Sequence, residues 1–274
     1  MKKITLFLTE RCNRNCSYCD ISKLGKRRTA RVDTIKKYCG LIKETDIEKI
    51  ILTGGETGML QLKTFTTMLN ELKGREIQVN TNGLFMKKYP QLLSEVKIQY
   101  HPVSEITEDI EQLYENVIYH IPVHRKNHLQ LGEFLEKYRD INFHLVPYDH
   151  KSELDEDYLL RPEDLEYIVD VARRRGNVSS LNILERAVKM EQLMDLYRTL
   201  CFVADWDISL DLVNMTIDKC VCSHERAAKV KLTEKSFKTL IGGSLKFEKT
   251  DLCSTCYHCV KGFNDIVNEN VSRI

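Results

Sequence analysis

The chain has 274 residues, which at about 150 residues per domain suits one large domain or one domain with an appendage. Lysine and arginine total 41 against 40 aspartates and glutamates, and the net charge of +1 argues against a broad electrostatic grip on nucleic acid or an anionic membrane. Apolar residues make up 42% and charged residues 30%, as in globular chains, and no apolar run approaches the length of about 18 residues that a membrane span needs.

Strand-like and helical patterns alternate through the first half of the chain. Short apolar and β-branched runs predict strands over residues 4–8, 49–53, 76–81, 96–100, 117–123 and 141–146. Apolar residues at helical spacing predict helices over residues 32–44, 62–72, 87–94, 106–115 and 128–139. Six βα units in series imply parallel strands with right-handed crossovers, and they fall short of the eight units of a closed barrel. We therefore predict an α/β fold built as a partial (β/α)6 TIM-type barrel.

The pattern changes in the second half of the chain. An acidic stretch over residues 149–157 predicts a surface loop, and helices are predicted over residues 162–175 and 182–198. Alternating apolar residues over 207–221, with a turn near Asn214, predict a β-hairpin. A boundary near residue 150 divides the chain into a barrel core over 1–150, connecting helices over 151–200 and a C-terminal domain over 201–274.

The ten cysteines are the most informative part of the composition. The opening apolar run is a strand rather than a secretory signal, because Thr5 interrupts it, Glu10-Arg11 ends it and no small-residue cleavage site follows. We therefore expect a cytoplasmic protein, in which thiols stay reduced. Clustered spacing of reduced cysteines then points to metal binding.

The first cysteine cluster follows the first predicted strand. Cys12, Cys16 and Cys19 form the spacing Cys-x3-Cys-x2-Cys, and three ligands leave one coordination position of a four-iron cluster open to a substrate or cofactor. The C-terminal ends of parallel strands are also where such folds bind ligands. A structural zinc site is the alternative, but it would need a fourth Cys or His, and residues 1–38 contain none outside the cluster.

The sequence resembles the radical S-adenosylmethionine (SAM) enzymes at three places. The first is the cysteine signature over residues 12–19, with the aromatic Tyr18 before its last cysteine. The second is Thr53-Gly54-Gly55-Glu56 after the second predicted strand, and the third is Thr81-Asn82-Gly83 after the third. The resemblance covers roughly residues 1–148 and implies the partial barrel of that family.

The resemblance also implies roles for individual residues. The three cysteines would hold a [4Fe–4S] cluster, and the amino and carboxylate groups of SAM would chelate its fourth iron. Gly54 and Gly55 would let the backbone approach the methionine moiety, and Glu56 would accept a hydrogen bond from its amino group. The full set of cofactor-binding residues that the resemblance implies is Tyr18, Gly54, Gly55, Glu56, Asn82, Gln99, His124 and Asn127.

Two positions depart from the family pattern. Gln99 stands where relatives often place a serine for the ribose of SAM, and Thr57 stands where many relatives have a proline. A basic run follows the first cluster, and it is predicted to be a solvated loop and helix face, with capture of an anionic substrate as the alternative. Its members are Lys23, Lys26, Arg27, Arg28 and Arg31.

A second group of cysteines lies in the C-terminal part of the chain, while Cys39 on a helical stripe is predicted to be an inert core thiol. The group resembles the auxiliary-cluster twitch or SPASM extensions of radical SAM enzymes, built from a β-hairpin plus a helix. The resemblance implies one auxiliary [4Fe–4S] cluster, and zinc is the alternative metal. The predicted ligands are Cys201, Cys220, Cys253 and Cys256, with Cys222 and Cys259 in reserve.

The resemblance implies a reaction class. A reduced cluster would cleave SAM to methionine and a 5′-deoxyadenosyl radical, and that radical would abstract a substrate hydrogen. An auxiliary cluster favours an oxidoreductase-type enzyme, which would dehydrogenate its substrate or form a C–C, C–S or C–N bond. The sequence assigns no catalytic acid, base or radical-quenching residue.

The expected partners follow from the same resemblance. We expect a small-molecule or peptide substrate, a flavodoxin- or ferredoxin-type electron donor and no membrane. A nucleotide- or nucleic-acid-modifying enzyme is the alternative that we favour less. An alternative from another class is a non-catalytic iron–sulfur or zinc module for electron transfer, which predicts no cleavage of SAM.

Overall fold

The chain is known from a computed structural model. It describes residues 3–17, 19, 21, 27–147, 156–158, 160–182, 184, 185, 188, 208–218 and 229–242. These residues form two compact units: the first takes those within 3–101, 114–117 and 208–242, and the second takes those within 102–113 and 118–188. The fold is α/β with a sheet rich in parallel strands that is not closed within the described residues, which confirms the predicted fold class.

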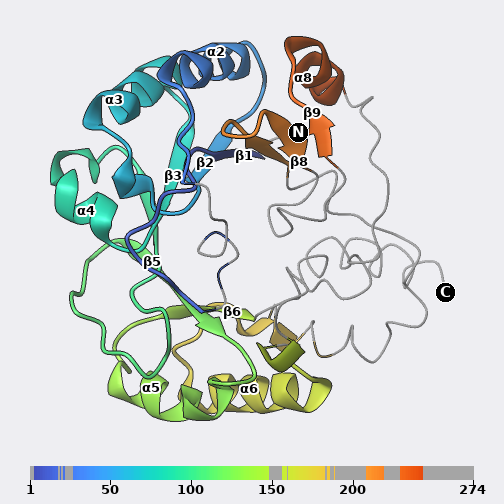
Figure 1. The fold of residues 1–274 in the computed structure, drawn as a ribbon. Helices are drawn as coiled ribbons and strands as arrows, with labels where there is room; N and C mark the ends of the chain where they lie inside the picture. Colours follow the sequence, from blue (N-terminus) through green and yellow to red (C-terminus); the bar gives the residue numbers. More distant parts are fainter. Residues whose placement is uncertain are drawn as a thin grey trace. The chain divides into compact units, whose positions relative to one another are not determined.

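The first unit begins with alternating strands and helices and ends with a small antiparallel extension. Its elements in chain order are β1 (Lys3–Phe7), α2 (Val32–Lys43), β2 (Lys49–Thr53), η1 (Thr57–Met59), α3 (Leu62–Glu71), β3 (Glu76–Thr81), α4 (Leu84–Lys88), η2 (Pro90–Leu92), β4 (Lys97–Tyr100), β7 (Ser209–Asp211), β8 (Thr216–Asp218), β9 (Lys229–Lys231) and α8 (Glu234–Ile241). Helices α2 and α3 pack side by side (Figure 1).

The strands of the first unit lie in the order β4-β3-β2-β1-β7-β8-β9. Strands β1 to β4 are parallel, as the βα alternation predicts. Strand β7 adds to the other side of β1, also in parallel and with Thr5 opposite Ser209, while β8 and β9 continue in antiparallel fashion. All parallel strands therefore end at one edge of the sheet, which we call the carboxyl edge.

Apolar residues at alternate strand positions build the core of the first unit. Ile4, Leu6, Ile50, Leu52 and Val79 share one face of three neighbouring strands, and each is fully buried. The predicted core thiol Cys39 on α2 is confirmed, since it is fully buried and burial raises its pKa to about 12.

The described part of the second unit includes the parallel strands β5 (Val117–Val123) and β6 (Phe143–Pro147) and the helices α5 (Leu131–Lys137) and α6 (Pro162–Arg175). It also includes the short helices η3 (His128–Gln130) and η4 (Glu156–Tyr158). Helices α5 and α6 lie side by side (Figure 1). Helix α6 begins at Pro162 and ends at Arg175, where the left-handed Gly176 follows, which confirms the predicted helix over 162–175.

All six predicted strands of the first half are confirmed within two residues at each end. The hairpin predicted over 207–221 is confirmed as β7 and β8 with a turn over residues 212–215. A helix is predicted over 182–198. Within this range the structure describes residues 182, 184, 185 and 188, and all four are helical. No helix among the described residues is long and apolar enough to cross a membrane.

Two predicted helices are wrong. Residues 106–115 form turns and bends, because the Ile110 amide donates to the Tyr138 hydroxyl at 2.9 Å instead of to a helical carbonyl. The helix predicted over 87–94 is divided into α4, which ends at Lys88, and the short η2, which begins at Pro90. Proline lacks an amide hydrogen and keeps the residue before it out of helical geometry, so α4 stops there.

Candidate functional site

The segment that follows β1 carries Cys12, Cys16 and Cys19, and we call it the cysteine loop. It leaves β1 at the carboxyl edge and at first stays paired to the end of β2. The Leu8 amide donates to Thr53 O at 2.9 Å, the Gly55 amide to Thr9 O at 2.6 Å and the Glu56 amide to Arg11 O at 2.8 Å. These bonds continue the ladder between the two strands beyond their last residues. They place Cys12, the next residue after Arg11, at the carboxyl ends of β1 and β2.

Gly54 and Gly55 are required by this close pairing. Gly54 has φ +146°, a backbone conformation that favours glycine, and a Cβ there would lie 2.4 Å from Thr9 O. A Cβ on Gly55 would lie 2.4 Å from Arg11 O and 3.2 Å from the Cβ of Cys12. The backbone that approaches these two glycines is therefore that of the cysteine loop. This packing requires glycine at both positions independently of the contact with SAM that the resemblance implies.

Glu56 is a buried acidic side chain at the carboxyl edge with four hydrogen-bond donors. Its side chain is fully buried, and its Oε1 accepts hydrogen bonds from the Gly58 amide at 2.7 Å, the Thr81 hydroxyl at 2.7 Å and the Phe85 amide at 3.2 Å. Its Oε2 accepts from the Asn82 amide at 2.6 Å. Burial raises the pKa of Glu56, and these four hydrogen bonds oppose that shift. Glu56 thus joins the segment after β2 to the segment after β3.

Asn82 connects the end of β3 to the cysteine loop. Its Nδ2 donates to Asn13 Oδ1 at 2.8 Å and lies 3.7 Å from the sulfur of Cys12, and the Arg14 amide donates to the same sulfur at 3.4 Å. Burial raises the pKa of the Cys12 thiol, and the nearby Glu56 and Cys19 raise it further, against the hydrogen bonds to the sulfur. Because a metal binds the thiolate, metal binding there must release the thiol proton.

Gln99 lies in a row of polar side chains on β3 and β4. The Gln78 side-chain amide donates to Gln99 Oε1 at 2.7 Å, and Gln99 Nε2 lies 3.2 Å from His101 Nε2. Arg14 Nη1, from the cysteine loop, donates to His101 O at 3.0 Å. The structure therefore links Gln99 through His101 to the loop that carries the cysteines.

His124 and Asn127 belong to the second unit, at the end of β5. Both are buried, and both contact Glu105: His124 Nε2 lies 2.8 Å and Asn127 Nδ2 lies 3.1 Å from Glu105 Oε2. Asn127 Oδ1 also accepts a hydrogen bond from the His124 amide at 2.9 Å. The two predicted residues thus act together on one carboxylate.

Several predicted site residues lie outside the described residues. They are Tyr18, Cys201, Cys220, Cys222, Cys253, Cys256 and Cys259. In the part of the chain that the structure describes, no three His, Cys, Asp or Glu side chains converge on one metal-ion position. The thiolates of a four-iron cluster each bind a different iron, so its ligands approach one another less closely than the ligands of a single ion.

The structure adds a pair of residues that the sequence does not single out. Glu10 precedes the cysteine loop and Arg28 follows it, and their side chains form an ion pair at 2.9 Å. Burial acts to raise the pKa of Glu10, but hydrogen bonds from Arg28 and Asn214 outweigh it and lower the pKa. Arg28 is therefore not simply one cation of a solvated basic run. The sequence signal that could have predicted this ion pair is the position of two opposite charges, Glu10 and Arg28, on either side of the cysteine loop.

Comparison with curated proteins gives partial matches to the chain. The family model described as the radical SAM superfamily matches residues 6–148. A GTP 3′,8-cyclase of Aquifex aeolicus (strain VF5) is 29% identical over 111 residues, which cover 38% of this chain and 35% of the relative. A protein of Methanocaldococcus jannaschii, whose name places it among glycyl-radical enzyme activating enzymes, is 27% identical over 176 residues, or 64% of this chain and 63% of the relative. The chain thus spans less than two thirds of these relatives.

Solved structures share the fold over most of the chain. The structure of anSMEcpe with bound AdoMet and Kp18Cys peptide has a TM-score of 0.62 at 12% identity, and the match covers 92% of this chain and 81% of that one. SuiB of Streptococcus suis bound to the precursor peptide SuiA has a TM-score of 0.57 at 14% identity, covering 93% and 70%. At such identities the likeness shows a common fold.

The family match includes the cysteine loop and the segments after β2 and β3 that hold it. It extends over more than half of the chain. The chain therefore belongs to the radical SAM superfamily, a family of enzymes that bind a [4Fe–4S] cluster and S-adenosylmethionine.

Proposed function

We propose that Cys12, Cys16 and Cys19 hold the [4Fe–4S] cluster and that this chain cleaves SAM reductively to start a radical reaction on its substrate. The observation that carries the proposal is the bonding of the cysteine loop to the ends of β2 and β3 at the carboxyl edge. This edge is where parallel α/β folds bind ligands. When bound, the cluster and SAM supply a one-electron cleavage of a carbon–sulfur bond.

The donor set of the loop suits such a cluster. It consists of three thiols on one short loop, and the sulfur of Cys12 already receives hydrogen-bond donors from the Arg14 amide and the Asn82 side chain. Hydrogen bonds to sulfur are one of the means by which proteins tune iron–sulfur clusters. The chain's own contribution is to orient these thiols through Asn82 and the pairing with Gly55 and Glu56.

The remaining predicted contacts to SAM divide into two groups. Asn82 directly follows β3, and Gln99 lies on β4 near its carboxyl end, positions that support contact with the cofactor. We propose that Tyr18 contacts the adenine. For His124 and Asn127, the shared contact with Glu105 supports a role in holding that carboxylate rather than in direct contact with SAM. For Glu56, four protein donors support a role in holding the site together.

We propose a second, auxiliary [4Fe–4S] cluster ligated by Cys201, Cys220, Cys253 and Cys256, with Cys222 and Cys259 as substitutes. The support is the cysteine spacing, together with the confirmed hairpin whose second strand ends two positions before Cys220. Such a cluster would accept an electron from the substrate radical, which favours a net oxidation. The electrons for SAM cleavage would come from a flavodoxin or ferredoxin in the cytoplasm, where thiols stay reduced.

A peptide or a small molecule is the proposed substrate. The structures of anSMEcpe and SuiB, which have a similar fold, each contain a bound peptide, and this supports a peptide substrate. A nucleotide is the second candidate, because the GTP 3′,8-cyclase of Aquifex aeolicus matches over 111 residues. Binding of candidate peptides and nucleoside triphosphates to the reconstituted protein would separate the two.

The test is anaerobic reconstitution of the chain with iron and sulfide, followed by SAM and dithionite. We expect release of 5′-deoxyadenosine, detected by chromatography with mass spectrometry, and its loss in Cys16→Ala. Cys39→Ala is the matched control, because Cys39 is a buried core thiol of α2 and should leave release unchanged.

Two results would reject parts of this proposal. Release of 5′-deoxyadenosine by Cys16→Ala would reject the cluster assignment, and no release by an iron-loaded wild-type protein would favour a non-catalytic module. Iron analysis addresses the auxiliary site: two four-iron clusters give about eight irons per chain, whereas about four irons with bound zinc would favour the zinc alternative.

A further inference from the structure

The loop that carries the cysteines leaves and re-enters the fold through a narrow neck. Residues 8–10 run antiparallel to residues 28–30: the Glu10 amide donates to Arg28 O at 2.8 Å, and the Ala30 amide donates to Leu8 O at 2.9 Å. The hydroxyls of Thr9 and Thr29 lie 2.9 Å apart across the same bridge. Glu10 and Arg28 therefore face each other at the two ends of the loop.

The side chains of these two residues are bonded at several points. Arg28 Nε donates to Glu10 Oε2 at 3.1 Å and Arg28 Nη2 donates to Glu10 Oε1 at 2.9 Å, the two-point geometry that makes arginine–carboxylate pairs strong. The Arg28 amide adds a third bond, to Glu10 Oε2 at 3.1 Å. Glu10 is only 4% exposed, so without Arg28 its charge would be left buried and uncompensated.

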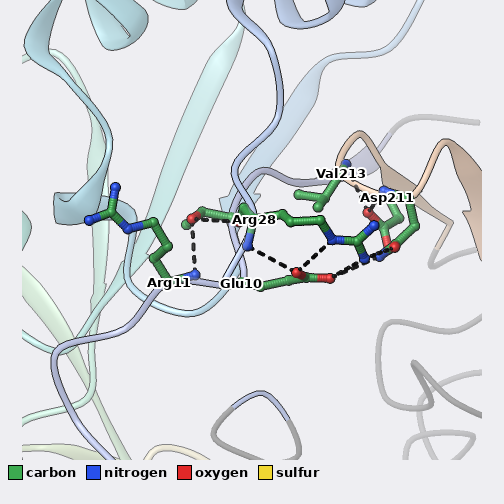
Figure 2. A network of polar contacts seen from close by, with 7 residues as sticks. Glu10, Arg11, Arg28, Asp211 and Val213 are labelled. Carbon is green, nitrogen blue, oxygen red and sulfur yellow. Dashed lines mark hydrogen bonds and ion pairs between the residues drawn. The ribbon is translucent and has the colours of Figure 1, made fainter. Parts of the chain in front are cut away.

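The hairpin of β7 and β8 joins this pair through its turn (Figure 2). Asn214 Nδ2 donates to Glu10 Oε1 at 3.3 Å, and Arg28 Nη2 donates to Asn214 Oδ1. Asp211 holds the turn in place, since its Oδ1 accepts from the amides of Val213 and Asn214 at 2.9 and 2.8 Å and its Oδ2 accepts from Asn214 Nδ2 at 2.7 Å. The side chains of Glu10, Arg28, Asp211 and Asn214 form one network, which we call the clasp.

We propose that the clasp is a positioning device for the iron–sulfur cluster: it closes the neck of the cysteine loop and thereby holds the three thiolates in the arrangement that binds the cluster. The inference rests on the proposed function. Cys12, Cys16 and Cys19 all lie between Glu10 and Arg28, which the clasp joins. Opening the neck would therefore lengthen the loop and increase the conformational entropy that is lost when the cluster binds. Asn214 makes the hairpin part of this support, from a position 204 residues away in sequence.

A purely structural ion pair is the competing explanation, and the chain offers a matched control for it. Glu76 at the start of β3 also carries two ion pairs, to Lys49 at 2.9 Å and to Lys97 at 2.6 Å. It lies at the opposite edge of the same sheet, away from the cysteine loop. Glu76→Gln therefore removes the carboxylate of two ion pairs from the same unit without touching the neck.

The experiment compares wild type with Glu10→Gln, Arg28→Lys, Asn214→Ala and Glu76→Gln, each as the full chain reconstituted anaerobically. One measurement is the rate at which the SAM-responsive EPR signal of the reduced cluster disappears after a ferrous chelator is added. A second is hydrogen exchange of backbone amides over residues 8–12 and 27–30 in the protein without iron. A third is the thermal unfolding midpoint of the protein without iron.

We expect Glu10→Gln and Arg28→Lys to lose the signal about tenfold faster than wild type, because each breaks a charge-assisted bond at a buried carboxylate. Arg28→Lys keeps the positive charge and removes the two-point geometry, so failure of lysine to restore slow loss shows that the geometry matters. Asn214→Ala should lose the signal about threefold faster than wild type, because it removes the hydrogen bonds of a neutral amide and leaves the ion pair in place. The same variants should exchange faster at the neck, and Glu76→Gln should stay within about twofold of wild type in both measurements.

The clasp inference is overturned if its variants lose the signal at the wild-type rate, or if Glu76→Gln accelerates loss as much for an equal drop in unfolding midpoint. Asn214→Ala retains the Glu10–Arg28 pair, so it keeps the test valid should the other variants fail to fold. A wild-type protein without any SAM-responsive signal would reject the proposed function instead. In that case the hydrogen exchange at the neck decides alone whether the clasp closes it, and unchanged exchange in Asn214→Ala overturns the inference.

Discussion

Glu56 and Glu76 lie at opposite edges of the first-unit sheet, and they differ in burial and in the direction of their pKa shifts. At the carboxyl edge, Glu56 is fully buried among four protein donors, and burial raises its pKa. At the amino edge, Glu76 bridges Lys49 and Lys97 with a third of its side chain exposed, and the hydrogen bond from Lys97 leads the causes that lower its pKa. The segments after β2 and β3 at the carboxyl edge are thus joined by one buried carboxylate, whereas the ends of β2, β3 and β4 at the amino edge are joined by partly exposed ion pairs.

Glu56→Ala is the strongest test of this difference. It removes the acceptor of the Gly58 and Asn82 amides and of the Thr81 hydroxyl, and it leaves the Phe85 amide with only the Thr81 hydroxyl at 3.3 Å as an acceptor. We expect the free energy of unfolding of the iron-free protein to fall by about 3 kcal/mol or more, measured by urea denaturation. Glu76→Ala is the control at the other edge, and an equal loss from both variants would contradict the contrast.

Gly55→Ala tests the close approach that the carboxyl edge requires. The new Cβ would lie 2.4 Å from Arg11 O, so the cysteine loop must move, and we expect a loss of about 1–3 kcal/mol in unfolding free energy together with loss of bound iron. Gly40→Ala is the matched control in α2, where a Cβ meets nothing within 4 Å. It should stabilise the protein by about 0.5–1 kcal/mol, and a similar destabilisation at both positions would refute the packing argument.

Asn82→Ala probes the hydrogen bonding of the Cys12 sulfur. Removing its Nδ2 takes away one donor to the sulfur and the bond to Asn13, which we expect to cost about 1 kcal/mol of unfolding free energy. Fewer donors to sulfur leave more negative charge uncompensated, so the midpoint potential of the reconstituted cluster should become more negative in a redox titration. Asn80→Ala, two positions earlier on β3 and bonded to Gln78 and Thr53, should leave the potential unchanged. A potential unaltered in Asn82→Ala would remove this residue from the cluster's surroundings.

Glu76→Gln gives the smallest effect and a pH dependence of known sign. A carboxyl whose pKa is lowered by folding stabilises the protein above the pKa of the unfolded chain, and that stabilisation is lost as the pH falls through the lowered value. The free energy of unfolding of wild type should therefore exceed that of Glu76→Gln at neutral pH. The difference should be less than about 1 kcal/mol, because the site is partly exposed. The difference should vanish on acidification below pH 4.5, the ordinary value for the group, as followed by urea denaturation. A difference that grows towards acid would show that the ion pairs are not its cause.

Local sequence patterns determined much of the molecule. The strands from β1 to β6 and the hairpin of β7 and β8 are confirmed, since alternation and flanking turn residues depend on neighbours a few positions apart. The cysteine spacing and the two motifs after β2 and β3 were sufficient to predict the family, because the chemistry of an open-cornered cluster needs those residue types in that order.

Only the tertiary structure decided how these parts are joined. Residues 106–115 have a helical pattern but form no helix, and the Ile110 amide instead donates to the Tyr138 hydroxyl, 28 positions away. Strand β7 pairs with β1, and the residues of β7 alone do not predict which strand it pairs with. The acceptor role of Glu56 and the clasp between Glu10 and Asn214 likewise join residues from 25 to 204 positions apart. Periodicity reports which face of an element is apolar, whereas the partner of a buried polar group depends on distances that exist only once the sheet has formed.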